Sequence, residues 1–193
     1  EFLGYDVTTQ GNWRNAYGSD GFVIPSRIQS IPPACSLTTS NTLIYEQSLT
    51  DDPRMPQLTT GLSRSRNCWV GGSKFGFTFN FTDEEIHQIA FYFSAWTRRD
   101  PPGGVTIFDA VSGASLDQRS LPNVNEGVYA IYNVRRQVFV QVNPPSFATN
   151  AEIYGIFFDR PHVVPLQLQP APGAFAGRTQ ISISTATPGV DIF

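Results

Sequence analysis

Four phenylalanines alternate with small or polar residues between positions 74 and 82, namely Phe75, Phe77, Phe79 and Phe81. Successive side chains of a β-strand point to opposite faces, so this segment predicts a strand with one wholly aromatic face. Such a face has to be buried, which restricts the chain to folds whose layers cover one another. After the polar turn 83–85, segment 86–96 places Ile89, Phe91 and Phe93 on one face. We expect this second strand to pair with the first or to lie in a facing sheet.

Further strand-like segments follow, each separated from the next by turn residues: 105–111, 115–121, 128–134, 137–142 and 152–158. Two shorter ones, 42–47 and 67–70, precede the aromatic strand. The chain has 16 glycines and 15 prolines, and no segment keeps a helical period for longer than a turn. Many short strands with regularly spaced turns indicate a sandwich or a barrel. The sequence therefore predicts an all-β fold, an antiparallel, jelly-roll-like β-sandwich over residues 1–160.

The composition changes after Arg160. Residues 161–176 contain Pro165, Pro170 and Pro172, and they predict an extended, proline-rich linker. Residues 177–193 predict a strand tail with a C-terminal β-hairpin, because Ile181 and Ile183 alternate with polar residues. An isolated hairpin is marginal in water. The tail should therefore fold back on its own sandwich or pair with an edge strand of a neighbouring subunit.

The charge of the chain argues against nucleic acid as a partner. The formal net charge is −3 and Lys74 is the single lysine, whereas binding to a phosphate backbone needs clustered cations. Charged residues make up only 15% of the chain, so its surface relies on Thr, Ser, Asn and Gln, as in many extracellular proteins. No run approaches the roughly 18 apolar residues that a membrane helix needs. We expect a secreted or cell-surface protein, seen as a mature chain without a membrane span.

Catalytic machinery is not evident in the sequence. The histidines are His87, in a strand, and His162, in the linker, and there is no Gly-x-Ser-x-Gly turn to carry a nucleophile. The acid pairs 51–52 and 84–85 point apart on an extended chain, so neither pair converges on one glycosidic bond. We therefore predict that the chain is not an enzyme and holds no catalytic cofactor.

Calcium is the metal that such a module could hold, through loop carboxylates and backbone carbonyls. The candidate ligands are Asp6, Asp20, Asp51 and Asp52. The alternative is that these side chains cap turns.

Two covalent features are predicted. Cys35 and Cys68 are the only cysteines, and in a lysine-poor, Thr/Asn/Gly-rich chain they predict one disulfide; the alternative is a pair of buried free thiols. Asn80-Phe81-Thr82 is an N-glycosylation sequon, which makes Asn80 a candidate glycosylation site.

Exposed aromatic rings beside amide or guanidinium groups are the parts of a sugar-binding site, because ring faces contact sugar C–H groups while polar groups bind hydroxyls. The first candidate group is Trp13, Tyr17 and Asp20, and the second is Trp96 with Arg98. For both tryptophans the alternative is packing in the core or at its rim.

The opening segment 6–22, DVTTQGNWRNAYGSDGF, resembles the start of carbohydrate-binding-module-like β-sandwich modules of large secreted bacterial proteins. Further matching segments are NCW at 67–69, FTD and HQIA within 81–90, IFDA and LDQR within 107–119, and IYGIFF at 153–158. The tail from Arg178 resembles the first hairpin of the immunoglobulin-like repeats found after catalytic domains in chitobiase-like enzymes. The resemblance implies a type of module and names no ligand.

Two functions from different classes follow. The first is a non-catalytic extracellular module that binds a glycan or acts as an adhesive. The second is a structural subunit of an extracellular fibre or surface layer, in which the C-terminal tail pairs with a neighbour's sheet.

Overall fold

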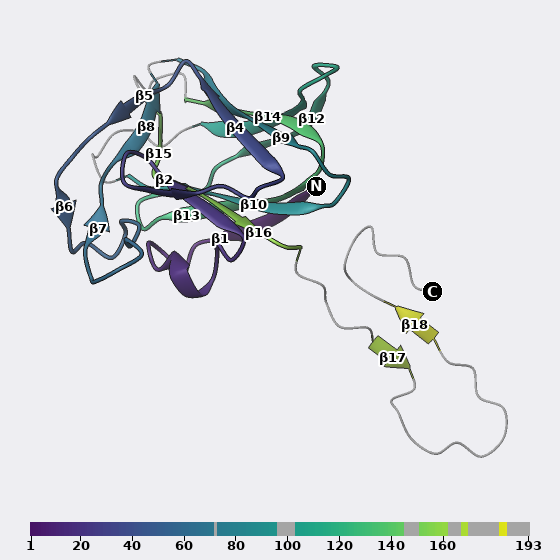
Figure 1. Cartoon of the computed structure of the whole chain (residues 1–193), viewed down its shortest axis with the longest axis horizontal. Coiled ribbons are helices and arrows are strands. Elements are labelled where there is room, and N and C mark those ends of the chain that lie inside the picture. The colour runs from purple at the N-terminus through teal and green to yellow at the C-terminus, as the bar shows by residue number, and fades with distance from the viewer. Residues whose placement is uncertain (72, 96–102, 145–150, 162–166, 170–181, 185–193) are drawn as a thin grey trace. The chain divides into compact units, whose positions relative to one another are not determined.

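The computed structural model describes residues 1–71, 73–95, 103–144, 151–161, 167–169 and 182–184 (Figure 1). The chain divides into two units, Glu1–Arg160 and Pro161–Phe193. Sheets with antiparallel pairing make up the first unit, and the helical element among the described residues is a short 3-10 turn, η1 (Trp13–Asn15). The predicted all-β, antiparallel sandwich is confirmed.

Two large sheets form the sandwich. The six-stranded sheet has the order β1 (Phe2–Asp6), β13 (Val128–Val134), β10 (His87–Phe93), β16 (Gly155–Asp159), β2 (Gly21–Ile24) and β3 (Ile28–Ser30). The five-stranded sheet has the order β12 (Ser115–Ser120), β11 (Gly104–Asp109), β14 (Gln137–Asn143), β9 (Phe75–Phe81) and β4 (Cys35–Ser40).

Two smaller sheets complete the first unit. A three-stranded sheet has the order β15 (Ala151–Ile153), β8 (Cys68–Gly71) and β5 (Leu43–Tyr45), and a ribbon pairs β6 (Leu49–Thr50) with β7 (Arg64–Ser65). No helix among the described residues is long and apolar enough to cross a membrane.

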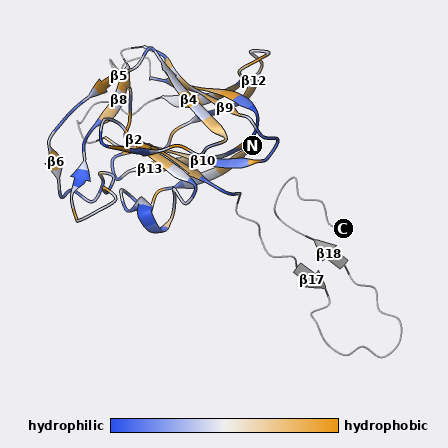
Figure 2. Cartoon of the chain, in the orientation of Figure 1, coloured by the Kyte–Doolittle hydropathy of each residue, from blue (hydrophilic) through white to orange (hydrophobic). Residues whose placement is uncertain are grey.

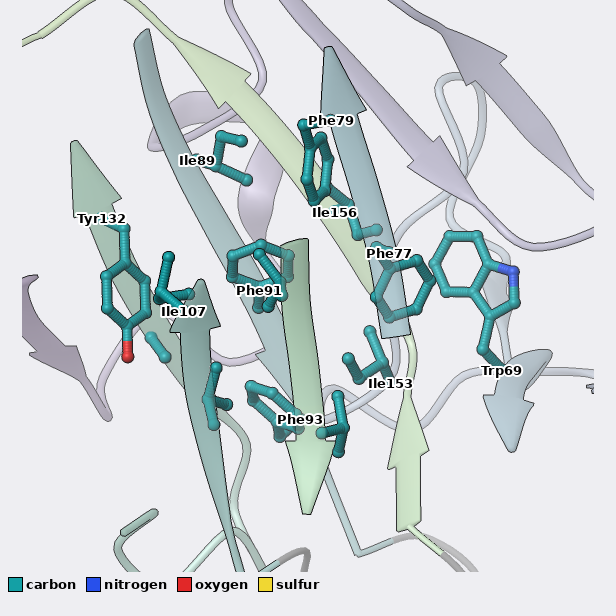
Figure 3. Packing of buried hydrophobic residues seen from close by; sticks show 14 of the residues in the cluster. Trp69, Phe77, Phe79, Ile89, Phe91, Phe93, Ile107, Tyr132, Ile153 and Ile156 are labelled. Carbon is teal, nitrogen blue, oxygen red and sulfur yellow. The ribbon is translucent and has the colours of Figure 1, made fainter. Parts of the chain in front are cut away.

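The aromatic face of β9 is buried between the two large sheets, as the alternation predicts. Strands β9 and β10 lie in facing sheets, and the rings of Phe79 and Phe91 meet edge to face with centroids 5.8 Å apart (Figure 3). Trp69 contributes from β8 and packs edge to face on Phe77 at 5.1 Å. Offset and edge-to-face pairs of this kind stabilise a core beyond the area that they bury.

A second core covers the other side of the six-stranded sheet. Residues of β10 alternate between the two, with Ile89 and Phe91 in the first and Ala90 and Tyr92 in the second. Trp13 belongs to the second core. The sheet is therefore buried on both faces, which explains why β10 reads as an almost continuous apolar run.

The segment 152–158 is not the single strand that the sequence predicts. It breaks at Tyr154, whose N–H donates to the carbonyl of Tyr92 at 2.9 Å, so that β15 joins the three-stranded sheet and β16 joins the six-stranded sheet. Tyr154 itself is fully buried. A hydrophobic run gives no sign of such a change of sheet.

In the second unit, β17 (Gln167–Gln169) pairs antiparallel with β18 (Ser182–Ser184). Strand β17 lies within residues 161–176, which the sequence predicts as an extended linker, and β18 lies within the predicted strand tail 177–193. The remainder of both predicted segments, 162–166, 170–181 and 185–193, lies outside the described residues.

The predicted disulfide is not formed, because Cys35 and Cys68 are not bonded to each other. Cys35 lies on β4 opposite Phe81 and packs at the margin of the first core, whereas Cys68 is fully buried in the second core. The two cysteines thus serve different hydrophobic clusters, and burial raises the pKa of the Cys35 thiol to about 12.

Candidate functional site

The five-stranded sheet has one face that points away from the sandwich core. Side chains of the five-stranded sheet that point away from the core form this outer face: Ser36, Thr38, Ser40, Gly76, Thr78, Asn80, Thr106, Phe108, Gln118, Gln137, Phe139, Gln141 and Asn143. None of these residues is charged. The same alternation that buries the phenylalanines of β9 therefore places hydroxyl and amide groups on the opposite side.

Two phenylalanines lie at the centre of the outer face. Phe108 on β11 is directly opposite Phe139 on β14, and the ring centroids are 6.1 Å apart at an interplanar angle of 31°. Both rings are partly exposed. A polar sheet face thus carries an aromatic pair that the sandwich core does not use.

Gly76 allows the Phe139 ring to lie across the neighbouring strand. A Cβ at position 76 would be 2.6 Å from the Cε2 and Cζ atoms of Phe139, so the ring occupies the space that a side chain would take. Glycine is needed here for this close approach. The ring therefore lies over the β9 backbone instead of standing clear of the sheet.

Polar side chains beside the rings form an ordered chain of hydrogen bonds. The Nε2 of Gln141 donates to Oδ1 of Asn143 at 2.6 Å, and the Nδ2 of Asn143 donates to Oγ1 of Thr106 at 2.9 Å. An amide has two N–H donors and an acceptor oxygen with two lone pairs. These bonds orient the amides and still leave donor and acceptor capacity for a ligand.

The outer face carries aromatic rings and hydrogen-bonding groups but has no group suited to acid–base chemistry. Serine and threonine hydroxyls become nucleophiles only beside a general base, and the outer face carries no histidine or carboxylate. Among the residues that the structure describes, no group of three or more His, Cys, Asp or Glu side chains could hold a metal ion. The chemistry available on this face is stacking and hydrogen bonding.

The structure places Trp13 in the second core, where it is only 3% exposed. Its ring lies 4.8 Å from Phe22 and 5.0 Å from Phe157, and its Nε1–H donates to the carbonyl of Gln57 at 2.8 Å. The loop that follows β1 folds over the six-stranded sheet, so Trp13 is not an exposed platform for a sugar. The alternative of core packing is the one that the structure shows.

Tyr17 and Asp20 are also engaged within the protein. The Tyr17 ring stacks on Tyr129 with centroids 4.3 Å apart, and its hydroxyl donates to Oδ2 of Asp6 at 2.9 Å. Burial and the Asp6 carboxylate raise the pKa of Tyr17. Asp20 lies 3.6 Å from the guanidinium of Arg160. The second predicted group, Trp96 and Arg98, lies outside the described residues.

The predicted calcium ligands do not converge. Oδ1 of Asp6 accepts from the N–H and the hydroxyl of Thr8, and Asp52 pairs with Arg54 at 2.7 Å. Asp51 is exposed. These contacts match the turn-capping alternative for Asp6 and an ion pair for Asp52.

The predicted glycosylation site lies on the outer face. Asn80 is partly exposed on β9, between Ser36 of β4 and Gln137 of β14. The hydroxyl of Thr82 donates to the carbonyl of Ala34 at 3.2 Å. A glycan on Asn80 would occupy the same face as the aromatic pair.

A cleft of about 520 Å³ opens between the edge strands β3 and β4. Its lining is mainly aliphatic and includes Val23, Ile28, Leu37 and Ile44, with Trp69 behind them. The Trp69 side chain is 4% exposed. Because a sugar needs an accessible ring face, the outer face suits a glycan better than this cleft does.

No model of a known protein family matches the chain, and no curated protein matches it. Among solved structures, the enzymatically active domain of tailspike protein 4 from bacteriophage CBA120 is similar in part, with a TM-score of 0.37 and 12% sequence identity. The similarity covers 65% of this chain and 19% of that chain. A likeness of this degree carries no argument about what the chain does.

Proposed function

We propose that the sandwich is a non-catalytic extracellular module that binds a neutral glycan on its outer face. The observation that carries this proposal is an uncharged face of hydroxyl and amide groups with the Phe108–Phe139 pair at its centre. A pyranose offers an apolar C–H face to an aromatic ring and hydroxyls to amides. The outer face offers the partners for both.

Because the outer face has no charged side chain, it favours neutral glycans over anionic ones. A sulfated or uronic-acid sugar would lose the hydration of its anion on binding and would need a cation in return. The outer-face residues include no lysine or arginine. We therefore expect a neutral oligosaccharide, and we expect its affinity to change little with ionic strength.

The strand register arranges the binding groups in rows across the sheet. One row contains Thr106, Gln141 and Gly76, and the adjacent row contains Phe108, Phe139 and Thr78. A linear oligosaccharide lying across the strands would contact rings in one row and amides in the next. This arrangement favours a chain of sugars over a single monosaccharide.

The test begins with a glycan array, followed by calorimetry with the best neutral oligosaccharide. Phe139→Leu removes the ring and keeps an apolar side chain, whereas Phe139→Tyr keeps the ring. We expect the leucine variant to lose at least about tenfold in affinity, or about 1.4 kcal/mol, and the tyrosine variant to bind nearly as well as the wild type.

A second pair of variants controls for the amides. Gln141→Ala lies on the outer face, and Gln29→Ala changes an exposed glutamine on β3. We expect only the first to weaken binding. Failure of the wild-type protein to bind any neutral glycan, or equal affinity in Phe139→Leu and wild type, would refute the proposal.

A further inference from the structure

The sheet edges of this protein differ in how they are protected. An unpaired edge strand invites pairing with another chain, and proteins guard such edges with charges, bulges, short length or cover. Strand β1 is irregular between Phe2 and Gly4, and its Tyr5 hydroxyl donates to the carbonyl of Ser120 on β12 at 2.6 Å. Strand β12 also carries the Asp117–Arg119 ion pair. Both edges on that side of the sandwich are guarded.

The edges on the other side are polar. Strand β3 contributes Gln29 and Ser30, and β4 is made of hydroxyl residues from Ser36 to Ser40 apart from Leu37. The aliphatic side chains Ile28 and Leu37 are half-buried in the cleft between these two strands, so a partner along either edge would meet mainly the polar side chains.

Strand β5 has the longest run of exposed apolar side chains among the edge strands whose side chains the structure describes. It pairs with β8 on one side, and none of its three residues carries a charge. Leu43 is 74% exposed, and Ile44 and Tyr45 are each 45% exposed. Figure 2 shows the strand as a hydrophobic arrow at the margin of the sandwich. Consecutive exposed apolar residues on an edge strand mark an interaction surface.

We propose that β5 pairs antiparallel with β5 of a second copy of this chain. A two-fold axis at Ile44 places Leu43 opposite Tyr45 of the second copy and Ile44 opposite its equivalent. Every facing pair is then apolar, so the short strand is self-complementary, as an isologous interface requires.

The flanking charges agree with the same register. Glu46 falls opposite Thr42 of the second copy, and Asn41 falls opposite Gln47. Like charges that face each other across strands destabilise a sheet, and this pairing brings none together. A different protein on this edge would have to supply a matching apolar strand, whereas a second copy already has one.

The cleft supplies further contact area. Ile44 pairs with Trp69 in the three-stranded sheet, and both residues line the cleft of about 520 Å³. In the dimer the two Ile44 side chains lie on one face of the joined sheet, next to this opening. Pairing through β5 would leave the outer face of each copy free, so that a dimer presents two such faces.

The experiment is analytical ultracentrifugation of the full chain over a hundredfold range of concentration. We expect a monomer–dimer equilibrium that Ile44→Lys shifts to monomer by at least tenfold in dissociation constant. The matched control is Thr38→Lys, which adds the same charge to another exposed edge strand, β4, and should leave the equilibrium unchanged. Thermal unfolding of each variant verifies the fold, and Ile44→Thr serves as a milder second variant.

Cross-linking tests the register. In a Cys35→Ser background, Ile44→Cys should form an intermolecular disulfide under mild oxidation, because facing Cα atoms in an antiparallel pair are about 4.5–5.5 Å apart. Leu49→Cys, on the exposed strand β6, should not. The proposal is wrong if the wild-type chain stays monomeric throughout, if Ile44→Lys leaves a dimer intact, or if Leu49→Cys cross-links as well as Ile44→Cys.

Discussion

The hydroxyl of Tyr17 donates a hydrogen bond of 2.9 Å to Oδ2 of Asp6 and ties the N-terminal loop to the end of β1. The other oxygen of this carboxylate accepts bonds from the backbone N–H groups of Thr8 and Thr9. Tyr17 in turn stacks on Tyr129 of the six-stranded sheet. One carboxylate thereby holds the loop that carries Trp13 over the second core.

This arrangement predicts a pH dependence of stability. Burial raises the pKa of the Asp6 carboxyl, but hydrogen bonds from Thr9 and Thr8 outweigh it and lower that pKa to about 2, from 3.8. Because the folded-state pKa is the lower one, the stabilisation is complete above pH 3.8 and is lost as the pH falls toward 2. Urea unfolding should show that the stability difference between wild type and Asp6→Asn shrinks across this window. Asp51→Asn, at an exposed position, is the control; a difference that stays constant with pH would contradict the assignment.

Substitution of Trp13 tests whether this residue stabilises the core or binds a sugar. Since its ring is 3% exposed between Phe22 and Phe157, Trp13→Ala should lower the free energy of unfolding by about 3–5 kcal/mol. Trp13→Phe should cost less, because it keeps most of the apolar volume. Denaturant unfolding measures both. A stable alanine variant that has lost only glycan binding would restore the platform interpretation.

The absence of a disulfide between Cys35 and Cys68 predicts a specific labelling pattern. Burial raises the pKa of Cys35 to about 12, and the thiolate is the reactive form, so iodoacetamide should label this half-buried residue slowly at neutral pH. Cys68 is fully buried and should be protected. Intact mass after unfolding without a reductant should show two labels. Zero labels would mean that the cysteines are bonded to each other after all.

Gly76 should be intolerant of a side chain. A Cβ at this position would lie 2.5 Å from the carbonyl oxygen of Val140 and 2.6 Å from the Phe139 ring. Gly76→Ala must therefore move the backbone of a central strand pair as well as the ring, which typically costs about 1–3 kcal/mol. Thermal unfolding of Gly76→Ala beside Thr78→Ala, on the same strand and face, measures the effect. Equal stability of the two variants would show that Phe139 does not lie over β9.

The fold was predictable from the sequence where apolar residues alternate regularly along a strand that has one buried face. The alternation from Phe75 to Phe81 predicted the aromatic core, because each side chain had a single possible side, but it left open whether β10 pairs with β9 or lies in the facing sheet. The predictions failed where a loop or another sheet packs against the strand in question. The burial of Trp13 depends on a loop folding over the far face of the six-stranded sheet, and the break at Tyr154 depends on a neighbouring sheet, neither of which a local pattern encodes.

The candidate site was missed for a related reason. Its signal is present in the sequence as the uncharged residues between the buried positions of β9 and β14, such as Thr78, Asn80, Gln137 and Gln141. Each segment alone shows only an ordinary polar alternation. The face becomes recognisable once the strand order places Phe108 beside Phe139.

Thr106 tests whether a residue of the outer face can affect glycan binding by positioning other side chains, without contacting the glycan itself. It is 6% exposed and accepts the hydrogen bond from Nδ2 of Asn143, which in turn holds Gln141. Thr106→Val keeps the shape of the side chain but leaves the Asn143 amide without this acceptor, at a cost of about 1 kcal/mol. We expect glycan affinity to fall severalfold although Thr106 itself offers a ligand almost no surface. Thr38→Val, at an exposed position of the same face, should preserve stability, and calorimetry with parallel unfolding measures both variants. An unchanged affinity in Thr106→Val would show that the hydrogen-bond chain does not organise the binding face.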